Sequence, residues 1–275
     1  MDILLSSYDF SYDPVTAISE DKAKGKTAEI FLDIKKTMDI PLVTSIWRGL
    51  AGMNNSLEDI WKLTKPIYLS GTPELALIKM VNSINFPIPN KFNHKDFSPK
   101  NIKNIREIIK VYNKSNGMNL MALSAFISSE YKPKGNIFNA NIQKKLLLSK
   151  FPRLLEKEEI NLETWNIVKN INSIGSPNGI NSHVATLWRH LAHWPNFLSI
   201  VYKNFKTLDQ KGQISEISTN ILEYIKKDGI NLKRQKTKYN NISEETISTI
   251  RDYVHTKNQV IRMVVLGNMM DIWIN

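Results

Sequence analysis

Apolar residues recur every three or four positions along most of this chain, which is the spacing of one face of an α-helix. The stretch 43–61 shows the pattern clearly, and the stretch 184–202 shows it again. Further helices are predicted over 73–82, 99–114, 118–129, 213–227 and 244–274. No stretch alternates apolar and polar residues for long enough to form a sheet. The pattern therefore predicts an all-α fold.

Local signals indicate where some of these helices begin or break. Pro195 interrupts the second stretch, and Asn54-Asn55 stands at the matching place in the first. Because proline removes a helical N–H and clashes with the preceding turn, we expect a break at Pro195. Ser243 followed by two glutamates is typical of a helix start.

The two stretches are similar in sequence as well as in pattern. Residues 42–62 and 183–203 are identical at eight of 21 positions at an offset of 141, including the dipeptides Trp47-Arg48 and Trp188-Arg189. Identity at this level between two segments of one chain indicates a common origin.

Flanking segments extend the similarity. Residues 28–35 resemble 162–169, and 105–121 match 247–263 at an offset of 142. A period this long does not suit a solenoid repeat, and it favours a duplicated helical domain, an internal pseudodimer. The expected parts are an N-terminal extension 1–26, a first repeat 27–130, a linker 131–160 and a second repeat 161–275.

Composition limits the classes of protein and leaves the partner open. The chain has 275 residues, a formal net charge of +11 and no cysteine, which excludes a disulfide scaffold and thiolate zinc sites. No apolar run approaches the length of a membrane span, and we expect a cytoplasmic protein. The charge suits a nucleic-acid or other anionic partner, whereas the abundance of Lys, Asn and Ile also fits an A·T-rich genome. The densest basic group lies over 226–238.

The Trp-Arg segments IPLVTSIWRGLAGM and VATLWRHLAHWPNFL resemble the DehI-type (group I) 2-haloacid dehalogenase family, and 187–195 is the most specific part. Members of this family act on D- and L-2-haloacids and are all-helical pseudodimers related to the AhpD-like fold. The resemblance covers about 27–130 and 160–272. It implies an all-α pseudodimer that needs neither a metal nor a cofactor.

The resemblance also implies a mechanism in which an aspartate that follows a serine activates the water that displaces halide. Counting back seven positions from Trp194 places Leu187 where this aspartate is expected, with Thr186 in the serine position. No Asp or Glu occurs from 164 to 207. Leucine cannot accept a proton, so the water-activating step lacks its base. The asparagine that helps to hold the water is matched by Asn113.

The implied pocket lies between the two repeats and suits a small carboxylic acid. Its expected lining consists of Leu42, Ser45, Asn113, His183, Thr186, Leu187 and Asn258. Arg48 and Arg189 have two interpretations. They clamp a carboxylate through paired hydrogen bonds, or they serve as structural groups that bind helix carbonyls or bridge the two repeats.

Three histidines, His183, His190 and His193, lie within eleven residues. They are structural side chains or metal ligands, although no carboxylate lies nearby in sequence to complete a hydrolytic metal site. His183 is also a candidate general base for a different reaction.

Three functional hypotheses follow from the sequence. The first is a 2-haloacid dehalogenase-like hydrolase, with His183 and Asn113 as its candidate catalytic residues. The second is a non-catalytic member of the family that binds a small molecule or an anionic partner such as nucleic acid. The third is a structural homodimer without chemistry.

Overall fold

The structure is a computed structural model, and it describes residues 17–128, 152–176, 184–227 and 242–275. These residues form helices joined by short irregular segments, with no strand among them. The predicted all-α fold is therefore confirmed. His183, residues 131–151 of the expected linker and the basic residues 228–238 lie outside the described part.

Five α-helices lie in the described residues of the first half. They are α1 (Gly25–Met38), α2 (Ser45–Ala51), α3 (Ser56–Leu69), α4 (Thr72–Ser83) and α5 (Pro99–Ile127). The expected break at Asn54-Asn55 is confirmed, because Asn55 adopts a left-handed conformation (φ 54°) immediately before α3. Asparagine tolerates this conformation better than most residues.

The described part of the second half holds six α-helices. They are α6 (Leu162–Asn172), α7 (Thr186–Leu191), α8 (Pro195–Gln210), α9 (Gln213–Lys227), α10 (Glu244–His255) and α11 (Arg262–Trp273). The break at Pro195 is confirmed, and the proline occupies the first turn of α8, where its missing N–H costs nothing. The start of α10 is capped as expected, because the Ser243 hydroxyl accepts the Thr246 backbone N–H at 3.2 Å.

Helices begin at similar places in the two halves. Helix α7 begins 141 residues after the start of α2, and α9 begins 141 residues after the start of α4. This order agrees with a duplicated domain, and the duplication itself stays a prediction from sequence.

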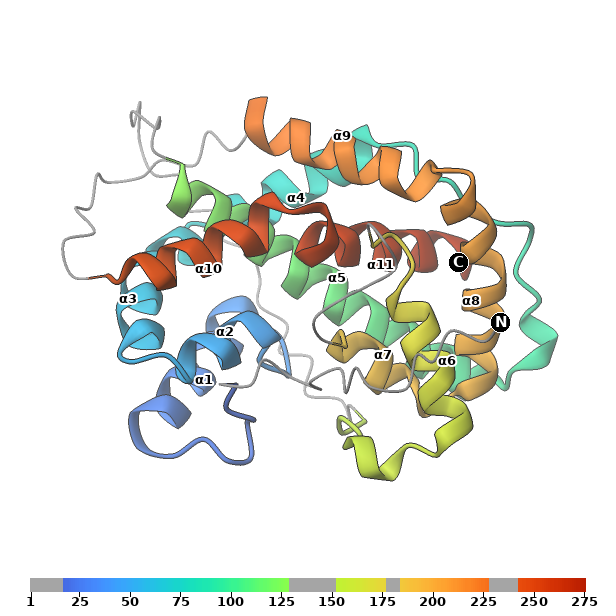
Figure 1. The fold of residues 1–275 in the computed structure, drawn as a ribbon, viewed down its shortest axis with the longest axis horizontal. Coiled ribbons are helices and arrows are strands. Elements are labelled where there is room, and N and C mark those ends of the chain that lie inside the picture. The colour runs from blue at the N-terminus through green and yellow to red at the C-terminus, as the bar shows by residue number, and fades with distance from the viewer. Residues whose placement is uncertain (1–16, 129–151, 177–183, 228–241) are drawn as a thin grey trace, which may run out of the picture.

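The middle of the molecule is a pair of long helical segments. Helix α5 and the α10–α11 segment run side by side in opposite directions, with α1–α3 towards one end of the pair and α6–α8 towards the other (Figure 1). Their most deeply buried residues are aliphatic, for example Ile105, Ile108 and Leu266. Burial of these side chains is the main stabilising contribution to the fold.

One predicted break does not occur. The sequence predicts separate helices over 99–114 and 118–129, but α5 continues through Ser115, Asn116 and Gly117. The glycine serves close packing instead of a turn, because a Cβ atom at Gly117 would overlap the Leu77 methyl groups of α4. Ser115, Asn116 and Gly117 are residue types common in loops, but here they lie inside a buried helix.

One predicted helix is broken. The sequence predicts a continuous helix over 244–274, but α10 ends at His255. A π-helical turn then spans Lys257–Ile261, and Gln259 within it has non-helical angles (φ −101°, ψ −129°). The Thr256 hydroxyl donates to the Asp252 carbonyl at 2.6 Å, a local bond that competes with the helix. In the described part of the chain, no helix is long and apolar enough to cross a membrane.

Candidate functional site

A small internal cavity lies where the two halves meet, beside α5, α7 and the break between α10 and α11. Its volume is about 30 Å³, which leaves room for about two water molecules. The described residues that line it are Thr44, Ser45, Tyr112, Asn116, Ala185, Thr186, Leu187, Tyr253, Asn258, Gln259, Val260, Arg262 and Met263.

The cavity brings together four residues that the sequence assigned to a pocket. Ser45 and Thr186 are the first residues of α2 and α7, Leu187 follows on α7, and Asn258 lies in the π-helical turn. Leu187 is 1% exposed. The place expected for the water-activating carboxylate is therefore a buried apolar wall of this cavity.

The lining is drawn from corresponding positions of the two halves. Ser45 and Thr186 are 141 positions apart, and so are Tyr112 and Tyr253. Asn116 and Asn258, which the sequence comparison also paired, are 142 apart. Hydroxyl, phenol and amide groups therefore line the cavity from both halves.

Other predicted site residues lie outside the lining. Leu42 is buried in the core, and neither Arg48 nor Arg189 borders the cavity. The Asn113 amide packs against Gly267 of α11, and its nitrogen and oxygen are both buried without a hydrogen-bond partner among the described residues. Asn116, one helical turn further along α5, is the amide that borders the cavity, and its pairing with Asn258 was the sequence signal for it.

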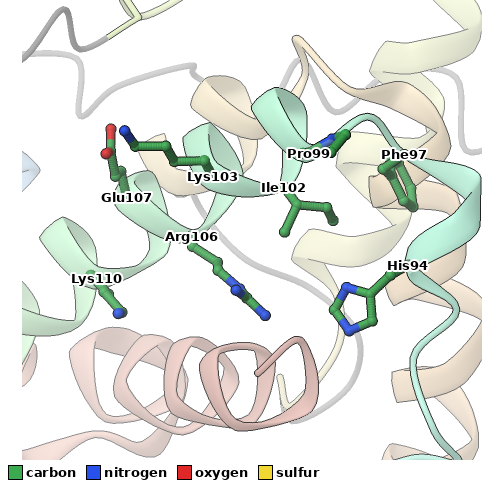
Figure 2. A pocket seen from close by; sticks show the side chains of 8 residues that line it. All are labelled: His94, Phe97, Pro99, Ile102, Lys103, Arg106, Glu107 and Lys110. Atoms are coloured by element: carbon green, nitrogen blue, oxygen red, sulfur yellow. The ribbon is translucent and has the colours of Figure 1, made fainter.

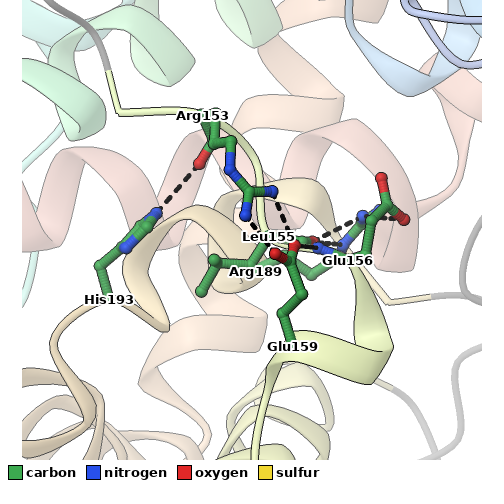
Figure 3. A network of polar contacts seen from close by, with 6 residues as sticks. All are labelled: Arg153, Leu155, Glu156, Glu159, Arg189 and His193. Atoms are coloured by element: carbon green, nitrogen blue, oxygen red, sulfur yellow. Dashed lines mark hydrogen bonds and ion pairs between the residues drawn. The ribbon is translucent and has the colours of Figure 1, made fainter.

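Arg189 is held by the segment that leads into α6 (Figure 3). Its guanidinium is almost fully buried, and Nε and Nη2 donate to the Leu155 carbonyl at 3.0 and 2.7 Å. Glu156 lies 3.4 Å from Nη2. Burial lowers the pKa of Arg189 to about 9. These contacts are those of a structural arginine, and no described contact places it at the cavity.

Two of the three clustered histidines bind the same segment. His193 Nε2 lies 2.9 Å from the Arg153 carbonyl (Figure 3), and His190 Nε2 lies 2.7 Å from the Pro152 carbonyl. A carbonyl only accepts, so each of these nitrogens carries a proton. Among the described residues, no three His, Asp or Glu side chains are grouped as metal ligands would be.

His190 connects the segment to the cavity. Because Nε2 carries the proton, Nδ1 accepts, and the Tyr112 hydroxyl donates to it at 2.9 Å. Burial is the largest cause that lowers the pKa of His190 to about 4, and the nearby His193, Arg189 and Arg48 lower it further. The imidazole is therefore neutral near pH 7, and it orients the phenol of a residue that lines the cavity.

Arg262 is the charged residue of the described lining. It is 3% exposed, Nη1 donates to the Asn172 and Ile174 carbonyls, and Nε is buried without a partner. Burial lowers its pKa to about 10, so the guanidinium stays protonated near pH 7. Asp209 favours the charged form through space and forms no ion pair with Arg262. Arg262 is therefore a buried cation whose described hydrogen-bond partners are neutral groups.

The sequence contained a signal for Arg262 that residue spacing alone did not reveal. From Val260 to Met270, it is the single charged residue in a stretch that is otherwise apolar except for Asn268. An arginine in such a stretch is carried into the interior with the helix, and a buried charge of this kind requires polar partners.

The described residues form an all-helical fold with a small polar cavity between two halves, and solved structures share the fold. A D-2-haloacid dehalogenase mutant superposes with a TM-score of 0.74 at 15% identity, over 94% of this chain and 95% of that one. The complexes of a mutant of such an enzyme with D-2-CPA and of the enzyme with L-LA each give 0.69 at 14% identity.

Comparisons of the sequence with protein-family models and with curated proteins gave no match. Identity near 15% shows a shared fold, and function has to be argued from the site. The resemblance to haloacid dehalogenases that the Trp-Arg segments indicated is supported at the level of the fold.

Proposed function

We propose that this protein binds a small carboxylic acid in the cavity between its two halves and does not hydrolyse 2-haloacids by a carboxylate-activated water. The observation that carries the proposal is that Arg262 and Leu187 line the same cavity. Arg262 is a buried cation that forms no ion pair with a described residue, and Leu187 stands where the base is expected.

Charge supports the binding part of the proposal. Neither Asp nor Glu lines the cavity in the described part of the chain, and Arg262 forms no ion pair there. A buried charge without a counter-ion is costly, so a bound carboxylate would relieve that cost. Guanidinium also suits a carboxylate by geometry, since two N–H groups can meet two oxygens.

The chemistry of the lining supports the second part. Direct displacement of halide needs a group that takes a proton from water near neutral pH. The described lining offers hydroxyls, amides and two phenols, and burial raises the pKa of the Tyr253 phenol. His190 lies behind Tyr112 and is too weak a base at a pKa of about 4.

Space limits the ligand to a very small acid. With about 30 Å³ available, an acid of three carbons fits only if lining side chains move. The π-helical turn is the natural place for that movement, because Gln259 already departs from helical geometry.

The proposal is tested by binding and turnover measured on the same samples. We expect calorimetry to detect binding of 2-chloropropionate, and we expect no halide release above a no-enzyme control. Arg262→Gln should weaken binding about tenfold or more, because the substitution removes a charge-assisted hydrogen bond to the carboxylate. Arg251→Gln is the matched control, because Arg251 is exposed on α10 and lies outside the lining.

Two further variants keep the outcome clear. Arg262→Lys retains the charge and serves if Arg262→Gln does not fold. Leu187→Asp introduces the missing carboxylate and should give halide release, with Leu187→Asn as the neutral control. Halide release by the unmodified protein would contradict the proposal and direct attention to His183, whose replacement by Gln should then abolish it.

A further inference from the structure

A second hollow, separate from the internal cavity, lies at the surface along the first turns of α5. Its volume is about 490 Å³, within the range of about 300–1,000 Å³ that is common for small-molecule sites. Its described lining is His94, Phe97, Pro99, Ile102, Lys103, Arg106, Glu107 and Lys110 (Figure 2).

Three cations lie on this one face of α5. Lys103, Arg106 and Lys110 are three and four positions apart, which stacks them along the helix. Glu107 is the single acid of the described lining, and no ion pair joins it to these cations in the described part. By contrast Lys114, one turn further, is paired with Asp39 at 3.3 Å and lies 3.9 Å from Glu74. The groove therefore carries unneutralised positive charge.

Arg106 is fixed in place at the centre of this row. Its Nε and Nη2 both donate to the Ile274 carbonyl beyond the end of α11, with an Nε distance of 3.0 Å. A carbonyl is neutral, so the anchor orients the guanidinium and leaves its charge available, with Nη1 making no hydrogen bond to the described residues. Figure 2 shows the side chains of Arg106 and His94 extending into the same space.

The end of the groove opposite Lys110 is apolar and aromatic. Phe97 and Ile102 form this wall, and Phe97 stacks on Phe92 with ring centroids 5.7 Å apart and planes at 15°. An aromatic surface that is held by a second ring is a rigid platform for a flat apolar group. The groove thus joins a cationic part to an aromatic part.

We propose that this groove binds a small phosphate monoester that carries a ring, with the phosphate at Arg106 and Lys110 and the ring against Phe97. A phosphate monoester carries a charge of about −1.5 to −2 near pH 7 and offers three acceptor oxygens, so it can meet several cations at once. A monocarboxylate has one charge and suits the buried Arg262 better. This proposal does not depend on the function proposed for the internal cavity.

Phenyl phosphate is the probe, titrated by calorimetry into the full-length protein. We expect saturable binding that weakens as salt is added, because the cations are partly exposed and therefore screened. Lys110→Glu should weaken the binding of phenyl phosphate about tenfold. This is more than the loss of one exposed ion pair would cause, because the new carboxylate also repels the phosphate. Lys100→Glu is the matched control, since Lys100 is exposed on the same helix outside the lining, and it should change binding less than about twofold.

Each result has a defined meaning. Loss of binding in Lys110→Glu with binding kept in Lys100→Glu supports the groove, and inorganic phosphate binding more weakly than phenyl phosphate supports the role of Phe97. Equal weakening by both variants overturns the proposal, because it indicates attraction to net charge. No binding of phenyl phosphate, with tight and salt-sensitive binding of a single-stranded oligonucleotide, overturns it in favour of a polyanion surface. Thermal unfolding checks that both variants fold.

Discussion

The two Trp-Arg helices share a dipeptide but differ in what surrounds it. In α2, Trp47 Nε1 donates to Asn119 Oδ1 at 3.1 Å, and Asn119 also accepts from the Tyr68 hydroxyl at 2.9 Å and donates to Thr44 at 2.8 Å. In α7, Trp188 Nε1 is buried and has no partner among the described residues. The position 142 residues after Asn119 is Ile261, which cannot accept.

The long central helices also differ between the two halves, because one is continuous and the other is broken. In the first half α5 continues for 29 residues. In the second half the corresponding segment breaks between His255 and Arg262, and that break supplies Asn258, Gln259 and Arg262 to the cavity lining. Trp47 is thus held in a hydrogen-bonded network beside a continuous helix, whereas the break in the second half lies at the cavity.

The largest expected effect comes from the centre of the first network. Asn119→Leu keeps the volume but leaves Trp47 Nε1 and the Tyr68 hydroxyl buried without an acceptor. We expect the free energy of unfolding to fall by roughly 3–5 kcal/mol, because each such group costs about 1–3 kcal/mol. Urea unfolding measures it. Ile261→Leu, the matched change in the second half, should cost less than about 1.5 kcal/mol, and equal losses would contradict the comparison.

The second half should also carry a pH dependence that comes from His190. The pKa of His190 is about 4 in the folded protein, against an ordinary value of 6.5. Between these values the unfolded chain binds more protons, so stability is full above pH 6.5 and falls as pH drops towards 4, by about 3 kcal/mol. Unfolding at several pH values, compared with His190→Gln, isolates this contribution. Gly49 stands 141 positions earlier and does not titrate. Burial also lowers the pKa of His255, so part of the slope should remain in the variant, and an unchanged slope would argue against His190.

Glycines pack differently in the two central helices. A Cβ atom at Gly267 would overlap the Asn113 amide, whereas one at Gly117 would overlap the flexible methyl ends of Leu77. We expect Gly267→Ala to cost about 1–3 kcal/mol and Gly117→Ala less, because a leucine terminus can rotate away. Thermal unfolding measures both. Adding Asn113→Ala to Gly267→Ala should recover most of the loss, and failure to do so would mean that the backbone, not the amide, sets the cost.

The sequence predicted the helices and their breaks where local chemistry decides them. Pro195 and Asn55 act within one turn, so their effect could be predicted without knowing the fold. The continuation of α5 through Gly117 could not be predicted, because it depends on Leu77 of another helix. The break near Gln259 likewise has neither proline nor glycine as a marker.

Part of the cavity lining was expected from the family resemblance. Ser45, Thr186, Leu187 and Asn258 were assigned to a pocket from the resemblance, and they line the cavity. Arg262 was missed because its importance is electrostatic, and burial of a charge depends on what packs around it. Asn113 and Asn116 lie about one helical turn apart on α5. Which of them borders the cavity depends on how α5 is oriented about its axis, and the sequence does not give that orientation.

The smallest expected effect tests the two tryptophans directly. Trp47→Phe and Trp188→Phe remove similar apolar area, but only the first breaks a hydrogen bond, and the second removes a buried N–H that has no partner. We therefore expect Trp47→Phe to be more destabilising by about 1 kcal/mol, the net value of one intramolecular hydrogen bond. Urea unfolding of the two variants under identical conditions measures the difference. A larger loss at Trp188 would mean that its indole N–H has a hydrogen-bond partner, and that the two tryptophans do not differ in this respect.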